Sequence, residues 1–425
     1  MNLVFFVLIV AAVMVAALAE ITGGSAALAE ITGGAGAMAG LSAAALKAAE
    51  GAVPLALGLV GVMALFLGLM KVAEEAGMIG ATARLLAPLM GRLFPQVPPA
   101  HPAMGAMVMN VAANLLGLGN AATPFGIRAM EHLQKLNPHK DCASDAQALF
   151  LALNTASVTI LPTSVIALRA ASGSVNPAAV IAPTLAATLV SAVVAIAAAR
   201  LLAPLFPLPP APPVQCPEES DEPLPPPLPA RYGWLALAAL IGVIGLMATH
   251  GAALGHWIVP GMMVGLLGYG LIRRVKIYEC FVDGAREGFA IAVRIIPYLV
   301  AILVAIAMLR QSGALDLALG PLARLTAPLG IPPEALTMAG LRSLSGSGSF
   351  GLLASYMNDP AIGPDSFTGI LLGTIYGSSE TTFYVLAVYF GAVGIRRMRH
   401  ALAAGLIADL AGLLAAVAAC VVLIT

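Results

Sequence analysis

The chain has 425 residues, of which 60% are hydrophobic and only 10% are charged, and its formal net charge is zero. Ordinary globular domains carry about 25% charged residues, so the surface of a soluble protein of this size could not be built from so few. A neutral chain also has no excess of basic side chains with which to bind nucleic acid. Several continuous apolar runs reach the ~20 residues that a membrane-spanning helix needs. The composition therefore predicts an all-α polytopic integral membrane protein.

The first apolar run, residues 1–20, ends in Ala17-Leu18-Ala19, which resembles a signal-peptide cleavage site. The run lacks a positively charged start and is long for a signal peptide, so we favour a retained transmembrane helix. A tandem duplication follows, in which AALAEITGG at 16–24 recurs at 26–34. Its glycine pairs predict an interfacial loop without chemistry of its own.

Further spanning segments and one long linker divide the rest of the chain. Proline is dense from residue 206 to residue 232, which excludes a helix interior and favours an extended, solvated tether. We expect a first half at 1–205 with a repeat core at about 51–202, and a second half at 233–425 with a repeat core at about 284–424. The predicted spans after the first are 51–70, 234–249, 257–272, 290–309 and 400–424.

The two halves repeat one set of elements in the same order. Each has a spanning helix, an ARLxAPL motif, a proline-rich turn, two polar stretches and a final span rich in Ala and Leu. The motif is ARLLAPLMG at 83–91 and ARLTAPLG at 323–330, and the polar stretches are 114–126 and 152–169 in the first half and 341–356 and 374–391 in the second. Internal repeats of this kind are characteristic of secondary transporters. The residues themselves leave open whether the repeats are parallel or inverted.

The first polar stretch, NLLGLGNAATPFG, interrupts an apolar segment that begins at Pro102 and is too short to span a membrane. This pattern predicts one arm of a re-entrant helical hairpin. Non-helical backbone within a membrane must be buried in protein or line a wet cavity, where its free polar groups can bind small solutes or ions. The alternative is close packing of Gly and Ser at helix contacts. Two such stretches at matching repeat positions favour the solute-binding role.

Two acidic residues lie inside apolar segments, where charges are costly and usually functional. Glu380 is flanked by hydroxyl side chains, which suits a cation, the polar end of a substrate or a coupling proton. Its alternative role is structural, either capping a helix or forming an ion pair with Arg342. Asp409 is the second candidate, and its alternative is an ion pair with Arg396 or Arg399.

The sequence carries no signature of an enzyme or of a cofactor. No GxxxxGK[ST], GxSxG or HExxH motif is present, and the four cysteines are too far apart to predict a disulfide framework or a zinc site. We therefore expect a protein that is not an enzyme and binds no cofactor or metal. A hydrolase using Ser345 or Ser347 is the minor alternative.

The longest motifs resemble a known family. LFPQVPPAHPAMGAMVMNVAANLLGLGNAATPFGIRAME at 93–131 resembles spore maturation protein A, and GSSETTFYVLAVYFGAVGIRRMRHALAAGLIADL at 377–410 resembles spore maturation protein B. The chain is thus similar to a fusion of the two, both of the nucleoside-recognition or Gate group, which is related to concentrative nucleoside transporters. The resemblance implies broken helices, inverted repeats and a multi-pass location in the bacterial cytoplasmic membrane. Some family members have Asp where this chain has Glu380, which leaves the ligand geometry open.

We expect a transporter or permease for a small polar solute. The solute is either a nucleoside-like molecule, another small amphoteric molecule or an ion. The protein would work by alternating access around a midplane site between the two hairpins, with H⁺ or Na⁺ as the coupling ion. The alternative is a membrane scaffold or ligand-sensing protein that transports nothing. The expected binding partners of the chain are the solute and the lipid bilayer, and a homo-oligomer is left open. The expected solute-binding residues are Asn110, Asn114, Gly119, Asn120, Thr123, Asn154, Thr155, Ser345, Gly346, Ser347, Ser379, Glu380 and Thr381, with Glu380 and Asp409 coupling the ion.

Overall fold

The computed structural model describes residues 2–21, 37–208, 229, a few positions between 235 and 257, 259–315, 317, 320, 321, 326, 328 and 330–424. In this part of the chain all regular structure is helical, and the only extended pairing is an isolated bridge between Cys142 and Arg397. The predicted all-α class is therefore confirmed. Residues 16–21, where the tandem duplication begins, are helical, so the predicted loop is wrong there; the rest of the duplication and most of the proline-rich linker lie outside the described residues.

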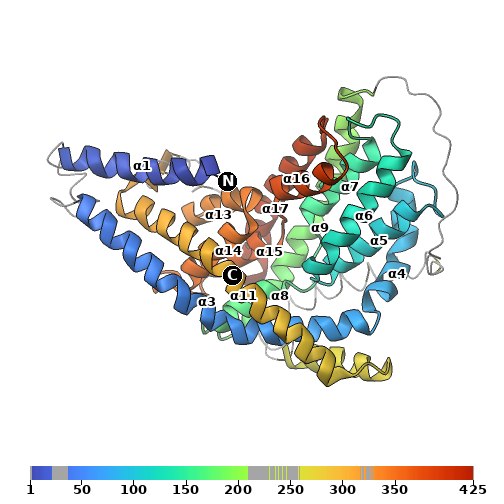
Figure 1. Cartoon of the computed structure of the whole chain (residues 1–425), viewed down its shortest axis with the longest axis horizontal. Helices are drawn as coiled ribbons and strands as arrows, with labels where there is room; N and C mark the ends of the chain where they lie inside the picture. Colours follow the sequence, from blue (N-terminus) through green and yellow to red (C-terminus); the bar gives the residue numbers. More distant parts are fainter. Residues whose placement is uncertain are drawn as a thin grey trace.

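The helices follow one another in two series (Figure 1). The first series is α1 (Asn2–Ile21), α3 (Ala37–Glu75), α4 (Met78–Leu93), α5 (Pro102–Leu115), α6 (Gly119–Leu136), α7 (Asp145–Ala156), α8 (Thr163–Ala171), η1 (Pro177–Val180), α9 (Ile181–Leu202) and η2 (Ala203–Leu205). The second series is α11 (Ile277–Gln311), α13 (Pro333–Leu344), α14 (Gly346–Met357), α15 (Phe367–Gly377), α16 (Thr382–Ala392) and α17 (Ala401–Ile424).

The same order of elements recurs in the two halves. A long helix (α3, α11) precedes a helical hairpin (α5–α6, α13–α14), a broken helix (α7–α8, α15–α16) and a final long helix (α9, α17). The counterpart of α4 would fall at ARLTAPLG, 323–330, which lies largely outside the described residues. The order predicted from the sequence motifs is thus present in the helices.

Each hairpin turns where the sequence places its small residues. His101 caps α5 by accepting a hydrogen bond from Ala103, and α5 ends at Leu115, before Gly117 with a φ of 76°. In the second hairpin the chain breaks at the extended Ser345, whose side chain caps α14. At 1.5 Å per residue, α5 is roughly 21 Å long. It is therefore too short to cross a bilayer core of about 30 Å.

Each broken helix consists of two short helices separated by unwound backbone. Residues 157–162 separate α7 from α8, starting with Ser157 in the left-handed conformation, and residues 378–381 separate α15 from α16. We call these the first and second unwound segments. Every residue from Ala146 to Ala156 is buried, so α7 lies in the middle of the protein. The unwound segments therefore begin in the protein interior.

Two arginine–aspartate pairs define the direction of the broken helices. Arg399, between α16 and α17, contacts Asp145 at the start of α7, with 2.6 Å between nitrogen and oxygen. Arg169, near the end of α8, contacts Asp365, just before α15, at 3.0 Å. The start of α7 thus lies beside the segment after α16, and the end of α8 lies beside the start of α15. The two broken helices run in opposite directions.

The hairpins are based at opposite ends of these broken helices. At the end of α6, Gln134 accepts a hydrogen bond of 3.0 Å from Gln147 in the first turn of α7. Just after α14, Asn358 donates to Ser172, three residues beyond Arg169, at 3.3 Å. Hairpin α5–α6 therefore starts from the Asp145 end, hairpin α13–α14 starts from the Arg169 end, and their tips point into the protein.

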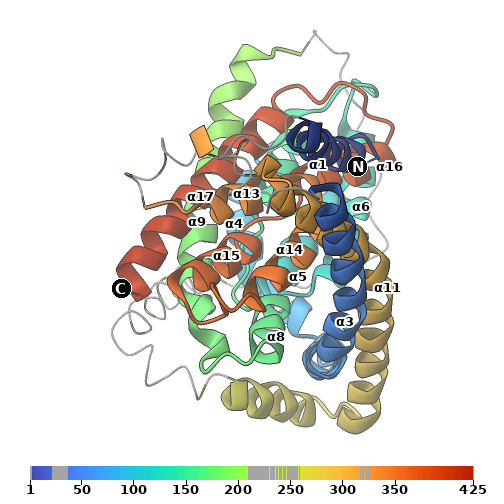
Figure 2. The ribbon, with the colours of Figure 1, turned by 90° about the vertical axis from the view of Figure 1, so that its left-hand side faces the viewer.

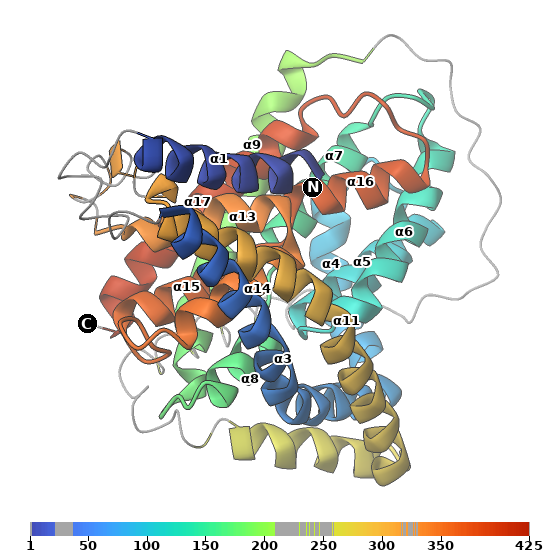
Figure 3. The same cartoon turned by 60° about the vertical axis from the view of Figure 1, so that its left-hand side comes forward.

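The long helices α3 and α11 hold the two halves together. They lie side by side in all views (Figures 2 and 3). A Cβ on Gly288 of α11 would lie 2.7 Å from the Cα of Ala64, and one on Gly284 would lie 2.6 Å from the carbonyl oxygen of Leu67. Only glycine permits so close a backbone approach. We call this contact the α3–α11 brace.

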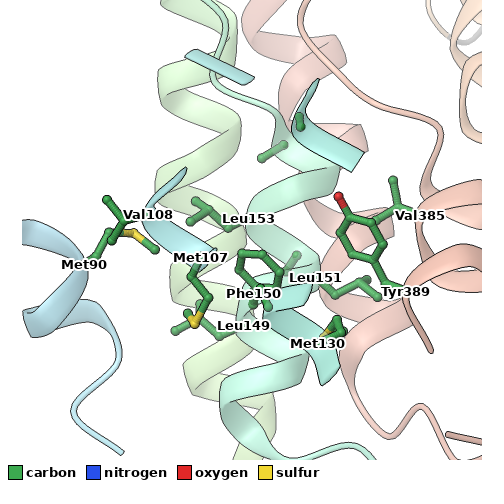
Figure 4. Close-up of a cluster of buried hydrophobic side chains, with 14 of the residues drawn as sticks. Met90, Met107, Val108, Met130, Leu149, Phe150, Leu151, Leu153, Val385 and Tyr389 are labelled. Carbon is green, nitrogen blue, oxygen red and sulfur yellow. The ribbon is translucent and has the colours of Figure 1, made fainter. Parts of the chain in front are cut away.

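A hydrophobic cluster packs around α7 (Figure 4). Phe150 lies at its centre, between methionines of α4 and α5 on one side and Tyr389 and Val385 of α16 on the other. The rings of Phe150 and Tyr389 are stacked, with centroids 6.2 Å apart. This packing fixes α16 of the second half against α7 of the first.

Within the described residues, two helices are long and apolar enough to cross a membrane, Pro177–Leu205 and Ala401–Ile424, and Phe5–Ile21 and Val259–Ile272 are shorter apolar helices. The last of the predicted spans, 400–424, corresponds to α17. The predicted spans 51–70 and 290–309 lie within α3 and α11. The span predicted at 234–249 lies mostly outside the described residues.

Candidate functional site

The two unwound segments meet inside the protein. The main-chain amide of Glu380 donates a hydrogen bond of 2.9 Å to the main-chain carbonyl of Thr155 in the last turn of α7. Thr155 is fully buried, and its hydroxyl donates to Ala152 within the same helix at 2.8 Å. The two broken helices thus cross where their backbones are free to bond outside their own helices.

The tip of the first hairpin packs on the first unwound segment. The amide of Ile160 donates to the carbonyl of Leu115 at 2.9 Å. A Cβ on Gly117 would collide with the carbonyl oxygen of Leu161, so this position needs glycine for its space as well as its φ. The side chain of Asn114 donates to the amide oxygen of Asn154 at 3.1 Å. The tip is therefore held by both backbone and side-chain hydrogen bonds.

A buried polar network continues from this tip to the second half. Asn110 donates to the carbonyl of Ala122 at 2.8 Å and to the hydroxyl of Tyr389 at 3.2 Å. Tyr389 in turn donates to Asn154 at 3.4 Å. The oxygen of the Asn110 amide is buried without a hydrogen-bond partner among the described residues. The network thus contains one acceptor that a bound water or solute could satisfy.

Arg342 holds the tip of the second hairpin to the second unwound segment. Its guanidinium donates to the carbonyls of Tyr376 and Ser379 and to the hydroxyl of Thr381. It also lies over the Tyr376 ring, 4.4 Å from the centroid. Only 6% of the Arg342 side chain is exposed. The guanidinium therefore supplies hydrogen-bond donors to carbonyls at and just beyond the end of α15, where the helix has no further amides to offer.

The carboxylate of Glu380 completes this arrangement. One oxygen lies 3.5 Å from the guanidinium of Arg342, and 41% of the Glu380 side chain is exposed. The ion pair given above as the alternative role of Glu380 is thus present. Its exposure still leaves the carboxylate able to contact a solute beside the crossing.

Asp409 lies in the third turn of α17 and contacts two other elements. One carboxylate oxygen accepts hydrogen bonds from Ser343 at 2.7 Å and from Thr382 at 2.6 Å. Arg399, one of the partners considered from the sequence, bonds to Asp145 instead. Asp409 therefore connects α17 to the second hairpin and to the first residue of α16, rather than forming the expected alternative ion pair.

The remaining expected residues lie around the same crossing. Ser345 caps α14 by accepting from the amide of Gly348 at 3.1 Å, and Ser347 is half-buried. A Cβ on Gly346 would approach the hydroxyl of Thr381 to 2.9 Å. Thr123 is half-buried in α6. Gly119 and Asn120 begin α6, and the surroundings of both residues lie outside what the structure describes.

Sequence reasoning missed four contributors to the site. Arg342 entered only as an alternative partner of Glu380, although it is the one charged residue between Glu334 and Asp359. A lone charge beside SLSGSGSFG was a usable signal. Ser343 and Thr382 were visible as hydroxyls of the polar stretches but without a partner, and Tyr389 carried no signal, because only the fold brings these three to Asp409 and Asn154.

The polar groups here are amides, hydroxyls, backbone groups, the Asp409 carboxylate and one Arg–Glu pair. Among the described residues, no group of three or more His, Cys, Asp or Glu side chains could hold a metal ion. The arrangement can donate and accept hydrogen bonds and can bind charge of either sign. Two hairpin tips thus meet two crossed, broken helices at this point.

The chain belongs to the Gate family, whose description is nucleoside recognition. The family matches residues 56–172 and 292–396, so the two matched regions contain the two hairpins and the two broken helices. The match in each half includes the unwound segment. The repeat seen in the helices is therefore a repeat of one family domain.

Two curated relatives correspond to the two halves. Spore maturation protein A of Bacillus subtilis is 46% identical over 150 residues, which are 35% of this chain and 76% of that protein. Spore maturation protein B of the same organism is 46% identical over 159 residues, which are 37% of this chain and 88% of that protein. They match different halves, so the predicted resemblance to a fusion of A and B is confirmed. No solved structure matches.

Proposed function

We propose that the protein is a membrane transporter for a small polar solute, which binds where the two broken helices cross. The observation that carries this proposal is the hydrogen bond between Glu380 and Thr155, with a hairpin tip packed on each side of it. Backbone that leaves its helix inside a membrane must line a cavity or be buried in protein, and in transporters it forms the binding site.

We further propose that the two halves are inverted repeats in a bacterial cytoplasmic membrane. The opposed directions of the two broken helices and the opposed bases of the two hairpins support inversion. The low charge content and the apolar helices Pro177–Leu205 and Ala401–Ile424 support a membrane location. In such an arrangement each hairpin would close the site from its own side of the membrane.

The chemistry of the site favours a small amphoteric solute. Arg342 and Glu380 offer opposite charges 3.5 Å apart, and Asn110, Asn114 and Asn154 offer amide groups that both donate and accept. A nucleoside, the ligand class that the family description names, has the same mixture of donors and acceptors. We assign no catalytic role to any of these residues, and the proposed activity is transport without covalent chemistry.

The test is uptake by purified protein in liposomes, with a panel of nucleosides, amino acids and small organic acids. We expect uptake of at least one class and a loss of about tenfold or more in Glu380→Gln, as for one lost charge-assisted hydrogen bond. Glu287→Gln is the matched control, because Glu287 is exposed on α11. The solute should also raise the melting temperature of the wild type, and less so that of Glu380→Gln.

The second candidate function is a scaffold or ligand sensor that transports nothing. The dense contacts of Arg342, which join the second hairpin to the second unwound segment, favour it because they hold that tip in one position. If no solute of the panel is taken up and Glu380→Gln leaves ligand-induced stabilisation unchanged, the transporter proposal is wrong and this candidate replaces it.

A further inference from the structure

A buried imidazole lies at the base of the first hairpin, away from the crossing. His101 is 8% exposed and stands immediately before Pro102, the first residue of α5. Its ring meets the ring of His132 of α6 edge to face, with the centroids 6.4 Å apart. The two arms of hairpin α5–α6 are therefore in contact at their base through two titratable rings.

His101 caps α5 in only one protonation state. Its Nδ1 accepts a hydrogen bond of 3.1 Å from the amide of Ala103, and its main-chain carbonyl accepts one of 2.9 Å from the amide of Met104. Pro102 has no amide hydrogen, so His101 satisfies the first two amides of the helix. A neutral imidazole has one nitrogen that accepts, whereas an imidazolium donates from both nitrogens. A proton on Nδ1 would therefore remove the acceptor of Ala103.

The surroundings of His101 also oppose a positive charge. Free amides give the start of a helix a partial positive charge, which disfavours a cation there. The charged and titratable side chains of the helix segments around this base are Glu131, His132 and Lys135 of α6, Arg92 of α4 and Arg200 of α9, whose guanidinium donates to the carbonyl of Leu93. The ones that act on His101 are His132 and Lys135, both basic, and Glu131 is exposed. The base of the hairpin thus has no acid that would stabilise a charged His101 among the described residues.

These surroundings set the direction of a pH response. Burial is the main cause that lowers the pKa of His101 below its ordinary value of 6.5, and His132 and Lys135 add to it. When the start of α5 opens, the ring is solvated and binds a proton more readily than in the capped state. The stability that the cap gives is therefore fully present above pH 6.5 and is lost as the pH falls below that value.

We propose that His101 is a pH sensor that releases the base of the first hairpin in acid. The same helix carries Asn114 near its other end, where Asn114 donates to Asn154 beside the crossing. Acid thereby weakens the end of α5 from which the first hairpin reaches into the protein. This inference goes beyond the proposed transport function, since it concerns the hairpin base and holds whether or not a solute is moved.

The test is hydrogen–deuterium exchange of the purified full-length protein at about pH 7.5 and about pH 5.5, on either side of the ordinary pKa of histidine. Each exchange rate is divided by that of an unstructured peptide of the same sequence at the same pH. We expect the protection of the first turn of α5 to fall by about fivefold or more in acid, the effect of one lost helix cap. His101→Asn keeps a capping side chain that does not titrate, so it should stay protected at both pH values.

Three further variants separate the cap from other effects of pH. His101→Ala has no cap and should show, at about pH 7.5, the low protection that the wild type shows in acid. His139→Gln changes a histidine of the turn after α6 and should respond to pH as the wild type does. His132→Gln removes a basic neighbour but leaves the cap in place, so it should also keep the response.

Each other outcome overturns the assignment. Equal protection of the wild type at both pH values removes the sensor. An acid response that persists in His101→Asn, or one that His132→Gln abolishes, places the titrating group elsewhere. If His101→Asn does not fold, His101→Ser, which also caps without titrating, decides in the same way. Full protection of His101→Ala at about pH 7.5 would show that the cap does not hold the start of α5.

Discussion

The main-chain amide of Glu380 bonds to the main-chain carbonyl of Thr155, and these residues belong to different halves of the chain. The bond joins two helices that both lose their regular hydrogen bonding at this point. Each also receives a hairpin tip there, through Leu115 in the first half and Arg342 in the second. The centre of the protein is thus made of four interrupted elements, two from each family domain.

Arg342 should be the most sensitive position of the second hairpin. Arg342→Ala leaves the carbonyls of Tyr376 and Ser379 without their donor, and we expect a loss of about 3–5 kcal/mol in the free energy of unfolding. Arg342→Lys keeps the charge but not the planar fork, so its loss should be smaller but clear. Chemical denaturation of the purified protein measures both. Arg286→Ala, in an exposed pair on α11, should change stability by about 0.5 kcal/mol or less, and a comparable effect of Arg342→Ala would contradict the assigned role.

Gly117 lies in the first hairpin tip, and Gly173, which follows α8, is a control position with a similar backbone conformation. Both have a φ near 80°, but a Cβ would strike the carbonyl of Leu161 at Gly117 and would meet nothing within 4 Å at Gly173. Gly173→Ala should therefore cost only the backbone strain, about 1–2 kcal/mol. Gly117→Ala should cost clearly more and should also reduce solute uptake, because the tip can no longer lie on the first unwound segment. Equal melting temperatures for the two variants would show that the tip does not pack closely.

The ion pairs at the ends of the broken helices should stabilise the protein more than ion pairs on its surface do. Arg169 is fully buried and bonds to Asp365, so Asp365→Asn should destabilise the protein by about 2–3 kcal/mol. Asp141→Asn removes the partner of Arg397, where both side chains are mostly exposed, and should change stability by less than about 1 kcal/mol. Denaturation at low and high salt measures both effects, and salt should weaken only the second pair. Equal losses in the free energy of unfolding for the two variants would contradict a stronger, buried Arg169–Asp365 pair.

The α3–α11 brace should hold the halves together without the linker. We expect residues 1–215 and 216–425, co-expressed as two chains, to co-purify. Gly288→Leu places a side chain against the backbone of Ala64 and should disrupt this association. Gly261→Leu has no atom within 4 Å of the new Cβ and serves as the control. Failure of the unmodified halves to co-purify would mean that the linker is needed for their association.

The sequence was enough to predict the repeated elements and the breaks, because Gly, Pro and Ser in an apolar background have local effects. Pro102 starts α5 and Ser345 interrupts the second hairpin, as the residue types indicate. The partners of Arg342 and Asp409 could not be predicted, since they are set by which broken helix crosses which. That Arg342 would satisfy the carbonyls of Tyr376 and Ser379 could not be predicted from the side-chain pattern. The roles of the individual site residues therefore remain predictions.

The Arg399–Asp145 and Arg169–Asp365 pairs and the crossing also have a mechanical consequence. Each broken helix continues for 9 to 12 helical residues on both sides of the crossing, and each of its ends is tied by an arginine pair to the opposite half. Each broken helix is therefore held at three points, at its two ends and at the crossing of Thr155 and Glu380. Sliding one broken helix along the other would have to break both arginine pairs and the crossing bond together, so the two family domains share one frame.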